Sequence, residues 1–166
     1  MRALVVLILG VAAGCGGSDP VWSSSVSQLV MLRYGGFGAP WQPTAECPVQ
    51  GVEYTLVMAD RSLSAWRCEN SLTPPHTLVR TTASRTLTNA ELDALVLKLE
   101  AFRVVSLDTC GADKEAVTTT LTTPSGVIEY GDSFYSCDEN DDRPKIESSA
   151  LDAVGNAFSK LLFPLP

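Results

Sequence analysis

The chain has 166 residues, of which 45% are hydrophobic and 19% charged. This length and composition are typical of one globular domain and carry too many apolar side chains for a disordered protein. The 12 Lys and Arg residues against 19 Asp and Glu residues give a net charge of −7, which argues against the broad basic surface that nucleic-acid binding requires.

The chain begins with a short positive segment and an apolar run. Met1 and Arg2 precede residues 3–13, all of which are apolar or Gly. As a helix this run would reach about 16 Å, roughly half of a bilayer's hydrocarbon core, which predicts the core of a signal peptide rather than a transmembrane anchor. Small residues then lead directly into a cysteine, in the order Ala12-Ala13-Gly14-Cys15.

This arrangement resembles the signal peptide of bacterial lipoproteins. The resemblance implies that residues 1–14 are removed, that Cys15 is lipidated, and that residues 15–26, rich in Gly and Ser, form a flexible tether. Two or three acyl chains hold a protein stably on a membrane, since each buried CH₂ contributes ~0.8 kcal/mol. Gly16 rather than Asp follows the cysteine, which implies the outer membrane rather than the inner. The alternative is an ordinary secretory signal with an incidental cysteine.

Strand-forming residues recur in short runs between turn residues. An Asp60-Arg61-Ser62 turn between two such runs predicts a β-hairpin. Most of the expected strands precede the first expected helix and the remainder follow it. We expect strands over residues 28–34, 51–59, 63–69, 77–85, 104–105, 116–123 and 127–130.

Two segments have the 3.6-residue periodicity of amphipathic helices. Thr88 and Glu91 form a capping box at the start of the first segment. The second begins near Ser148 or Ser149, with Asp152 placed to favour its N-terminus. The two apolar stripes are Leu92, Leu95, Val96, Leu99 and Phe102, and Leu151, Val154, Phe158, Leu161 and Leu162. We therefore expect an α+β fold, a mostly antiparallel sheet with both helices packed on one face, in a single domain over residues 27–166.

Four cysteines remain after Cys15, and an even number in an exported protein predicts two disulfides. Three pairings are possible. We favour Cys47–Cys68 and Cys110–Cys137, because each pair brackets a local run of strands, and each bond would contribute about 3 kcal/mol. A four-cysteine zinc site is the alternative, but the chain has no C-x-x-C pair, so we expect no metal.

A second resemblance concerns the expected domain, over residues 27–163. Its motifs are similar to those of uncharacterised domains in bacterial secreted proteins and lipoproteins. The resemblance supports the fold and implies no activity. The matching residues are Cys47-Pro48, Tyr54 in the first hairpin, Leu87-Thr88 before the helix, Cys110-Gly111 with Asp113, and Gly126 after the Thr-rich strand.

Aromatic residues in a Gly- and Pro-rich loop are candidates for binding. Tyr34, Phe37 and Trp41 lie in or beside residues 35–43. Exposed, they would form a surface for a partner protein or a glycan; packed beneath the loop, they would only stabilise it.

Other candidate sites have simpler interpretations. His76 is the only histidine and follows two prolines, and the chain has no Gly-x-Ser-x-Gly motif, so we expect a solvated loop residue and no catalytic residues. Asp138, Asn140 and Asp142 occupy positions 1, 3 and 5 of a calcium-loop pattern, although Arg143 stands at its Gly position. We interpret residues 138–142 as a solvated acidic loop and leave weak calcium binding open.

The sequence thus predicts a membrane-anchored lipoprotein of the bacterial cell envelope that is not an enzyme and has no cofactor. Its partners would be the membrane, through the lipid on Cys15, and an envelope protein or glycan. One alternative is an inhibitor-like module that caps an exported enzyme. Another is an envelope hydrolase that uses a pair of carboxylates among the 19 acidic residues.

Overall fold

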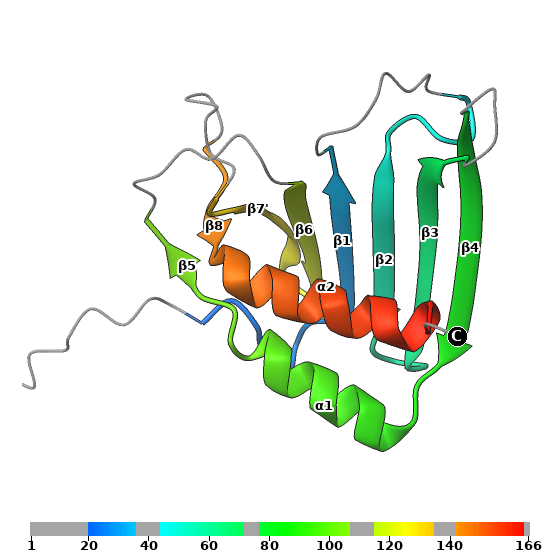
Figure 1. Cartoon of the computed structure of the whole chain (residues 1–166). Coiled ribbons are helices and arrows are strands. Elements are labelled where there is room, and N and C mark those ends of the chain that lie inside the picture. Colours follow the sequence, from blue (N-terminus) through cyan, green and yellow to red (C-terminus); the bar gives the residue numbers. More distant parts are fainter. Residues whose placement is uncertain (1–19, 36–43, 72–76, 107–114, 135–141, 165–166) are drawn as a thin grey trace, which may run out of the picture.

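The structure is a computed structural model that describes residues 20–35, 44–71, 77–106, 115–134 and 142–164. Strands and helices follow one another much as the sequence predicts, and the α+β expectation is confirmed (Figure 1). The elements are β1 (Gln28–Tyr34), β2 (Gly51–Val57), β3 (Ser62–Asn70), β4 (Leu78–Thr86), α1 (Asn89–Leu99), β5 (Val104–Val105), β6 (Ala116–Thr123), β7 (Gly126–Asp132), β8 (Lys145–Ile146) and α2 (Ser148–Leu162).

The strands form one eight-stranded sheet in the order β4-β3-β2-β1-β6-β7-β8-β5. The first four strands make an antiparallel meander, and β6 pairs with the other edge of β1 before turning back into β7. Only β7 and β8 pair in parallel among the described strands. The expectation of a mostly antiparallel sheet is therefore confirmed, whereas β8 was not predicted.

The hairpin between β2 and β3 follows the predicted turn. The Asp60 carboxylate accepts a hydrogen bond from the Ser62 backbone N–H at 3.0 Å, and Arg61 adopts a left-handed conformation with φ 57°. This turn places Val57 opposite Ser62 and, further along the ladder, Glu53 opposite Trp66. The register of the hairpin thus brings a carboxylate and an indole side by side.

Both helices lie on the same face of the sheet (Figure 1). The capping box of α1 is confirmed, because Thr88 accepts from the Glu91 N–H and the Glu91 carboxylate accepts from the Thr88 N–H. Helix α2 begins at Ser148 as predicted, but its N-cap is Glu147, without a side-chain cap. Asp152 instead binds the guanidinium of Arg33, 3.3 Å away, because that cation reaches from β1 into the layer between sheet and helix.

The main core fills the space between the sheet and the two helices. The predicted stripes supply its helical side, with Leu95 and Leu99 of α1 and Leu151, Val154 and Phe158 of α2 all buried. The sheet supplies Leu29, Met31, Tyr54, Leu56, Leu63, Val117 and Leu121. The rings of Tyr54 and Phe158 pack with their centroids 5.4 Å apart, and burial raises the pKa of the Tyr54 phenol.

Residues 20–26 pack on the domain, although the sequence assigns them to the tether. Trp22 and Val26 are buried in the main core. The Val21 N–H donates to the Phe102 carbonyl at 3.2 Å, and Pro20 forms a β-bridge with Arg103. This part of the chain therefore belongs to the folded domain, because its apolar side chains have a core to enter.

A second, small cluster contains the disulfide between Cys47 and Cys68, whose Cα atoms are 5.7 Å apart. Both cysteines are fully buried together with Leu78, and Trp66 packs against them. The favoured pairing of these two cysteines is thus confirmed. The described residues contain one disulfide where we predicted two, since Cys110 and Cys137 lie outside them and their pairing stays a prediction.

The predicted signal peptide and Cys15 also lie outside the described residues. Neither α1 nor α2, the helices of the described ranges, is long and apolar enough to cross a bilayer.

Candidate functional site

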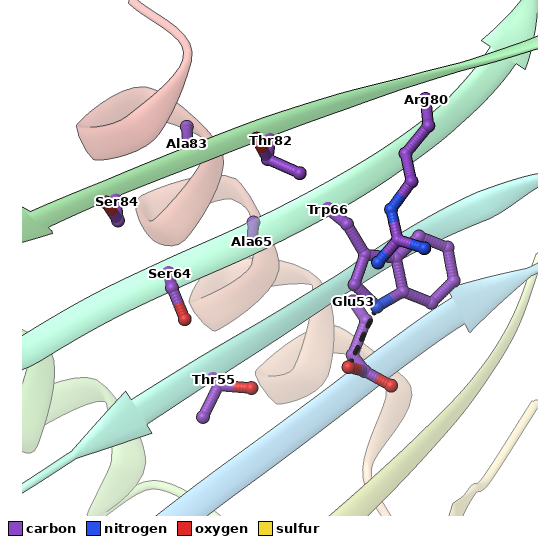
Figure 2. Close-up of a pocket in the computed structure, with 9 residues that line it drawn as sticks. All are labelled: Glu53, Thr55, Ser64, Ala65, Trp66, Arg80, Thr82, Ala83 and Ser84. Carbon is purple, nitrogen blue, oxygen red and sulfur yellow. Dashed lines mark hydrogen bonds between the residues drawn. The ribbon is translucent and has the colours of Figure 1, made fainter. Parts of the chain in front are cut away.

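The face of the sheet away from the helices, called here the open face, is rich in hydroxyl groups. Side chains alternate along a strand, so residues next to the core-facing Tyr54 and Leu63 point to the other side. The ladders place Thr55, Ser64 and Ser84 in one row across three strands. Thr118, Thr120 and Thr122 of β6 share this face, because Val30 of β1 stands opposite both Thr55 and Thr120. Figure 2 looks onto this face, with α2 behind the sheet.

A shallow hollow of about 310 Å³ lies on the open face over β2, β3 and β4. Its polar lining combines three kinds of group: one carboxylate, one guanidinium and four hydroxyls. Its lining residues are Glu53, Thr55, Ser64, Ala65, Trp66, Arg80, Thr82, Ala83 and Ser84 (Figure 2).

Three side chains at one side of the hollow contact one another and form the Glu53–Trp66–Arg80 cluster. The Trp66 indole N–H donates to a Glu53 carboxylate oxygen at 2.9 Å. The Arg80 guanidinium carbon lies 5.2 Å from the centre of the indole, so the cation faces the aromatic ring. These contacts hold the three side chains in one arrangement, visible in Figure 2.

The disulfide loop supports this cluster from one end of the strands. Trp66 packs against Cys47, Cys68 and Leu78. Arg80 donates from Nη1 to the carbonyl oxygen of Glu46 at 3.1 Å, so the loop before β2 also orients the guanidinium. The bond between Cys47 and Cys68 therefore helps to position side chains that line the hollow.

The hollow offers both hydrogen-bond donors and hydrogen-bond acceptors. A carboxylate only accepts, a guanidinium only donates, and a hydroxyl does both. The indole of Trp66 mainly holds these groups in place, because Arg80 lies over its ring and the disulfide cluster packs against it. Such a surface suits a ligand that carries many hydroxyls, which is the chemistry of a sugar.

The structure places only one of the three aromatic residues predicted to bind. Tyr34 is half-buried at the end of β1, opposite Gly51 and Ala116, on the open face. Phe37 and Trp41 lie outside the described residues, so the aromatic surface stays a prediction.

The other sequence candidates lie mostly outside the described ranges. This holds for His76, Cys110, Cys137 and residues 138–141, whereas Asp142 is described and exposed. Within the described ranges, no group of three or more His, Cys, Asp or Glu side chains could hold a metal ion. Cys47 and Cys68 are bonded to each other, which contradicts the alternative of a zinc site made from all four cysteines.

Sequence reasoning missed the Glu53–Trp66–Arg80 cluster, although two of its three residues could have been paired from the sequence. The Asp60 turn sets the register of β2 against β3, so counting back from it pairs Glu53 with Trp66. No comparable turn in the sequence fixes the position of Arg80 relative to Trp66. The segment between β3 and β4 contains two prolines and no recognisable tight turn, so the register of β4 could not be counted.

No protein-family model, curated protein or solved structure matches this chain.

Proposed function

We propose that this chain is an exported lipoprotein, anchored to a bacterial membrane through lipid on Cys15, with the outer membrane preferred. Its domain is a binding module that holds an envelope glycan in the hollow of the open face. The module has no catalytic role in this proposal. Lipid anchoring would concentrate the domain beside the polymers of the envelope, where even modest affinity keeps a ligand bound.

The disulfide supports export. Disulfides persist in oxidising compartments outside the cytosol and are rare in cytosolic proteins. The bond between Cys47 and Cys68 is fully buried and joins a loop to the middle of the meander, as expected of a structural disulfide. The apolar run that ends at Cys15 is the matching export signal.

The Glu53–Trp66–Arg80 cluster is the observation that carries the proposal of glycan binding. Trp66 is fixed on one side by the Glu53 carboxylate and on another by the disulfide cluster. Side chains already held in place lose little conformational entropy when a ligand binds. Four hydroxyls on the neighbouring strands line the same hollow and offer further hydrogen bonds.

Titration with envelope glycans tests the proposal. The full chain, purified from membranes in detergent, would be titrated with soluble peptidoglycan fragments and with lipopolysaccharide oligosaccharides, using tryptophan fluorescence and calorimetry. We expect saturable binding to one of these glycans. Glu53→Gln and Arg80→Gln should each weaken it at least tenfold, because each removes a charged partner of the hydrogen-bonding surface.

The matched control is Thr122→Ala, which removes a hydroxyl from the same face outside the hollow. It should leave the affinity within twofold of the wild type. Absence of saturable binding to any glycan would contradict the proposal, and so would equal affinity of the wild type and both hollow variants.

A further inference from the structure

Strand β4 ends the sheet with a long open edge. It has nine residues, seven of them exposed, and no strand of the described ranges pairs with its outer side (Figure 1). The opposite end of the sheet is β5, which has two residues and lies beside the bridge from Pro20 to Arg103. Unpaired N–H and C=O groups along a strand are a template for pairing with another chain.

The ladder between β3 and β4 shows which backbone groups of β4 are free. The Leu87 N–H donates to the Arg61 carbonyl and the Ser71 N–H donates to the Thr77 carbonyl, each at 2.9 Å. Both bonds follow the register in which Ala65 lies opposite Ala83. Hydrogen-bonded pairs alternate along an antiparallel ladder, so odd-numbered residues of β4 bond to β3. The even-numbered residues point their backbone groups outward: Leu78, Arg80, Thr82, Ser84 and Thr86.

The usual protections of an edge strand are missing from β4. Proteins block such edges with Pro, with Lys and other charges, or with bulges. Strand β4 contains no Pro, Lys, Asp or Glu. Its two arginines bind within the domain, since Arg80 contacts Trp66 and the Glu46 carbonyl, while Arg85 binds the Glu91 carboxylate at 2.7 and 2.9 Å.

We propose that β4 pairs antiparallel with β4 of a second copy of this chain, across a twofold axis at Thr82. In this register each even-numbered residue faces an even-numbered residue of the second copy. Five residue pairs then exchange two backbone hydrogen bonds each. The two sheets join into one, with the helices of both copies on the same side.

The strand is complementary to itself in this register. Arg80 faces Ser84 of the second copy and Arg85 faces its Val79, so no like charges stand opposite each other. Thr82 faces its own counterpart, and Thr–Thr pairs across strands are favourable. A charged foreign peptide has less to recognise, because both guanidinium groups of β4 already have partners. A second copy is therefore the occupant that fits best.

Pairing would also join the two open faces. Thr82 and Ser84 line the hollow at the side of β4, so the hollows of both copies would flank the axis on one surface. The proposed dimer does not depend on glycan binding, because the two copies pair only through the backbone and side chains of β4.

Cysteine crosslinking in the native membrane tests the register. The full chain with Thr82→Cys should form a disulfide-linked dimer, because directly opposed residues in a hydrogen-bonded pair have Cα atoms about 5.5 Å apart, within disulfide range. Thr86→Cys is the matched control on the same strand, since Thr86 faces Leu78 of the second copy and lies far from its own counterpart. Equal crosslinking of both variants, or none for Thr82→Cys, would overturn the proposal.

A second variant tests the interface without a new thiol. Thr82→Lys places two ammonium groups opposite each other and should reduce the dimer fraction at least tenfold in native mass spectrometry of the full chain. Leu97→Lys on α1, where the side chain is 70% exposed, should leave it unchanged. A far-UV circular dichroism spectrum equal to that of the wild type shows that both variants fold, whereas the melting temperature itself can fall when the dimer dissociates. A dimer that persists with Thr82→Lys lies elsewhere on the protein and would also overturn the proposal.

Discussion

The disulfide between Cys47 and Cys68 should contribute a large share of the stability of the domain. The perturbation is the double substitution Cys47→Ala with Cys68→Ala. Substitution is preferable to a reductant, because a reductant would also open the predicted bond between Cys110 and Cys137. The double variant removes one crosslink and leaves those two cysteines untouched.

The loop length sets the expected magnitude. The bond joins residues 21 positions apart. The chain-entropy relation then gives about 3 kcal/mol at 25 °C for the restriction that the crosslink places on the unfolded chain. Both sulfurs are also fully buried beside Leu78 and Trp66, so their removal leaves a small void that adds to the loss.

Urea unfolding of the full chain, followed by circular dichroism, measures this difference. We expect the double variant to lose at least about 3 kcal/mol of unfolding free energy. The indole N–H resonance of Trp66 should move as well, because the disulfide cluster helps to hold that ring against Glu53. A loss below about 1 kcal/mol would contradict this expectation, since it would mean that the crosslink barely restricts the unfolded chain.

Four further predictions concern individual residues. Gly51→Ala would place a Cβ 2.1 Å from a backbone oxygen of β1 and should cost about 1–3 kcal/mol in urea unfolding. In Gly155→Ala the added Cβ would meet only the movable end of the Arg33 side chain, and Ala has about 1 kcal/mol better helix propensity than Gly. We therefore expect this variant to gain about 1 kcal/mol of unfolding free energy in urea, and a loss of the same size would contradict this explanation. Hydrogen bonds from the Thr88 N–H and hydroxyl lower the pKa of Glu91. The stability that ionised Glu91 contributes to the fold is therefore complete above about pH 4.5 and is lost as the pH falls through the lower pKa of Glu91 in the folded state. Urea unfolding between pH 2 and 7 should show a smaller pH dependence for Glu91→Gln, and an unchanged one would be the contrary result. Burial raises the pKa of Tyr54. The unfolded chain therefore loses the phenol proton of Tyr54 at a lower pH than the folded protein does. The free energy of unfolding should fall as the pH rises above about 10. Tyr54→Phe should reduce that alkaline loss in thermal melts, and an identical loss would show that another group titrates.

Local signals predicted most of the fold. The Asp60 turn set the first hairpin, and the Thr88–Glu91 capping box marked the start of α1. Strand β8 was not predicted because Lys145 and Ile146 follow Pro144 and lack the two adjacent β-branched residues that indicated the equally short β5. The pairing of β8 with β7 is also a contact between distant segments. A run of two residues becomes a strand only because its neighbours in space supply partners.

The position of Trp22 was missed for a related reason. The surrounding Ser-rich segment has the composition of a tether, but the ring is 8% exposed in the main core. Whether one aromatic side chain finds a buried place depends on the three-dimensional arrangement of helices and strands. The nearest side chain to Gly155 of α2 is the guanidinium end of Arg33 from β1, a contact between distant segments that no local pattern indicates.

The most direct test of lipid anchoring is the mass of the N-terminal peptide of the protein purified from bacterial membranes. As a lipoprotein, the chain should lack residues 1–14 and begin with Cys15, which carries a diacylglycerol group on its sulfur. An N-terminal peptide that retains residues 1–14, or a Cys15 without acyl mass, would contradict the proposed anchoring.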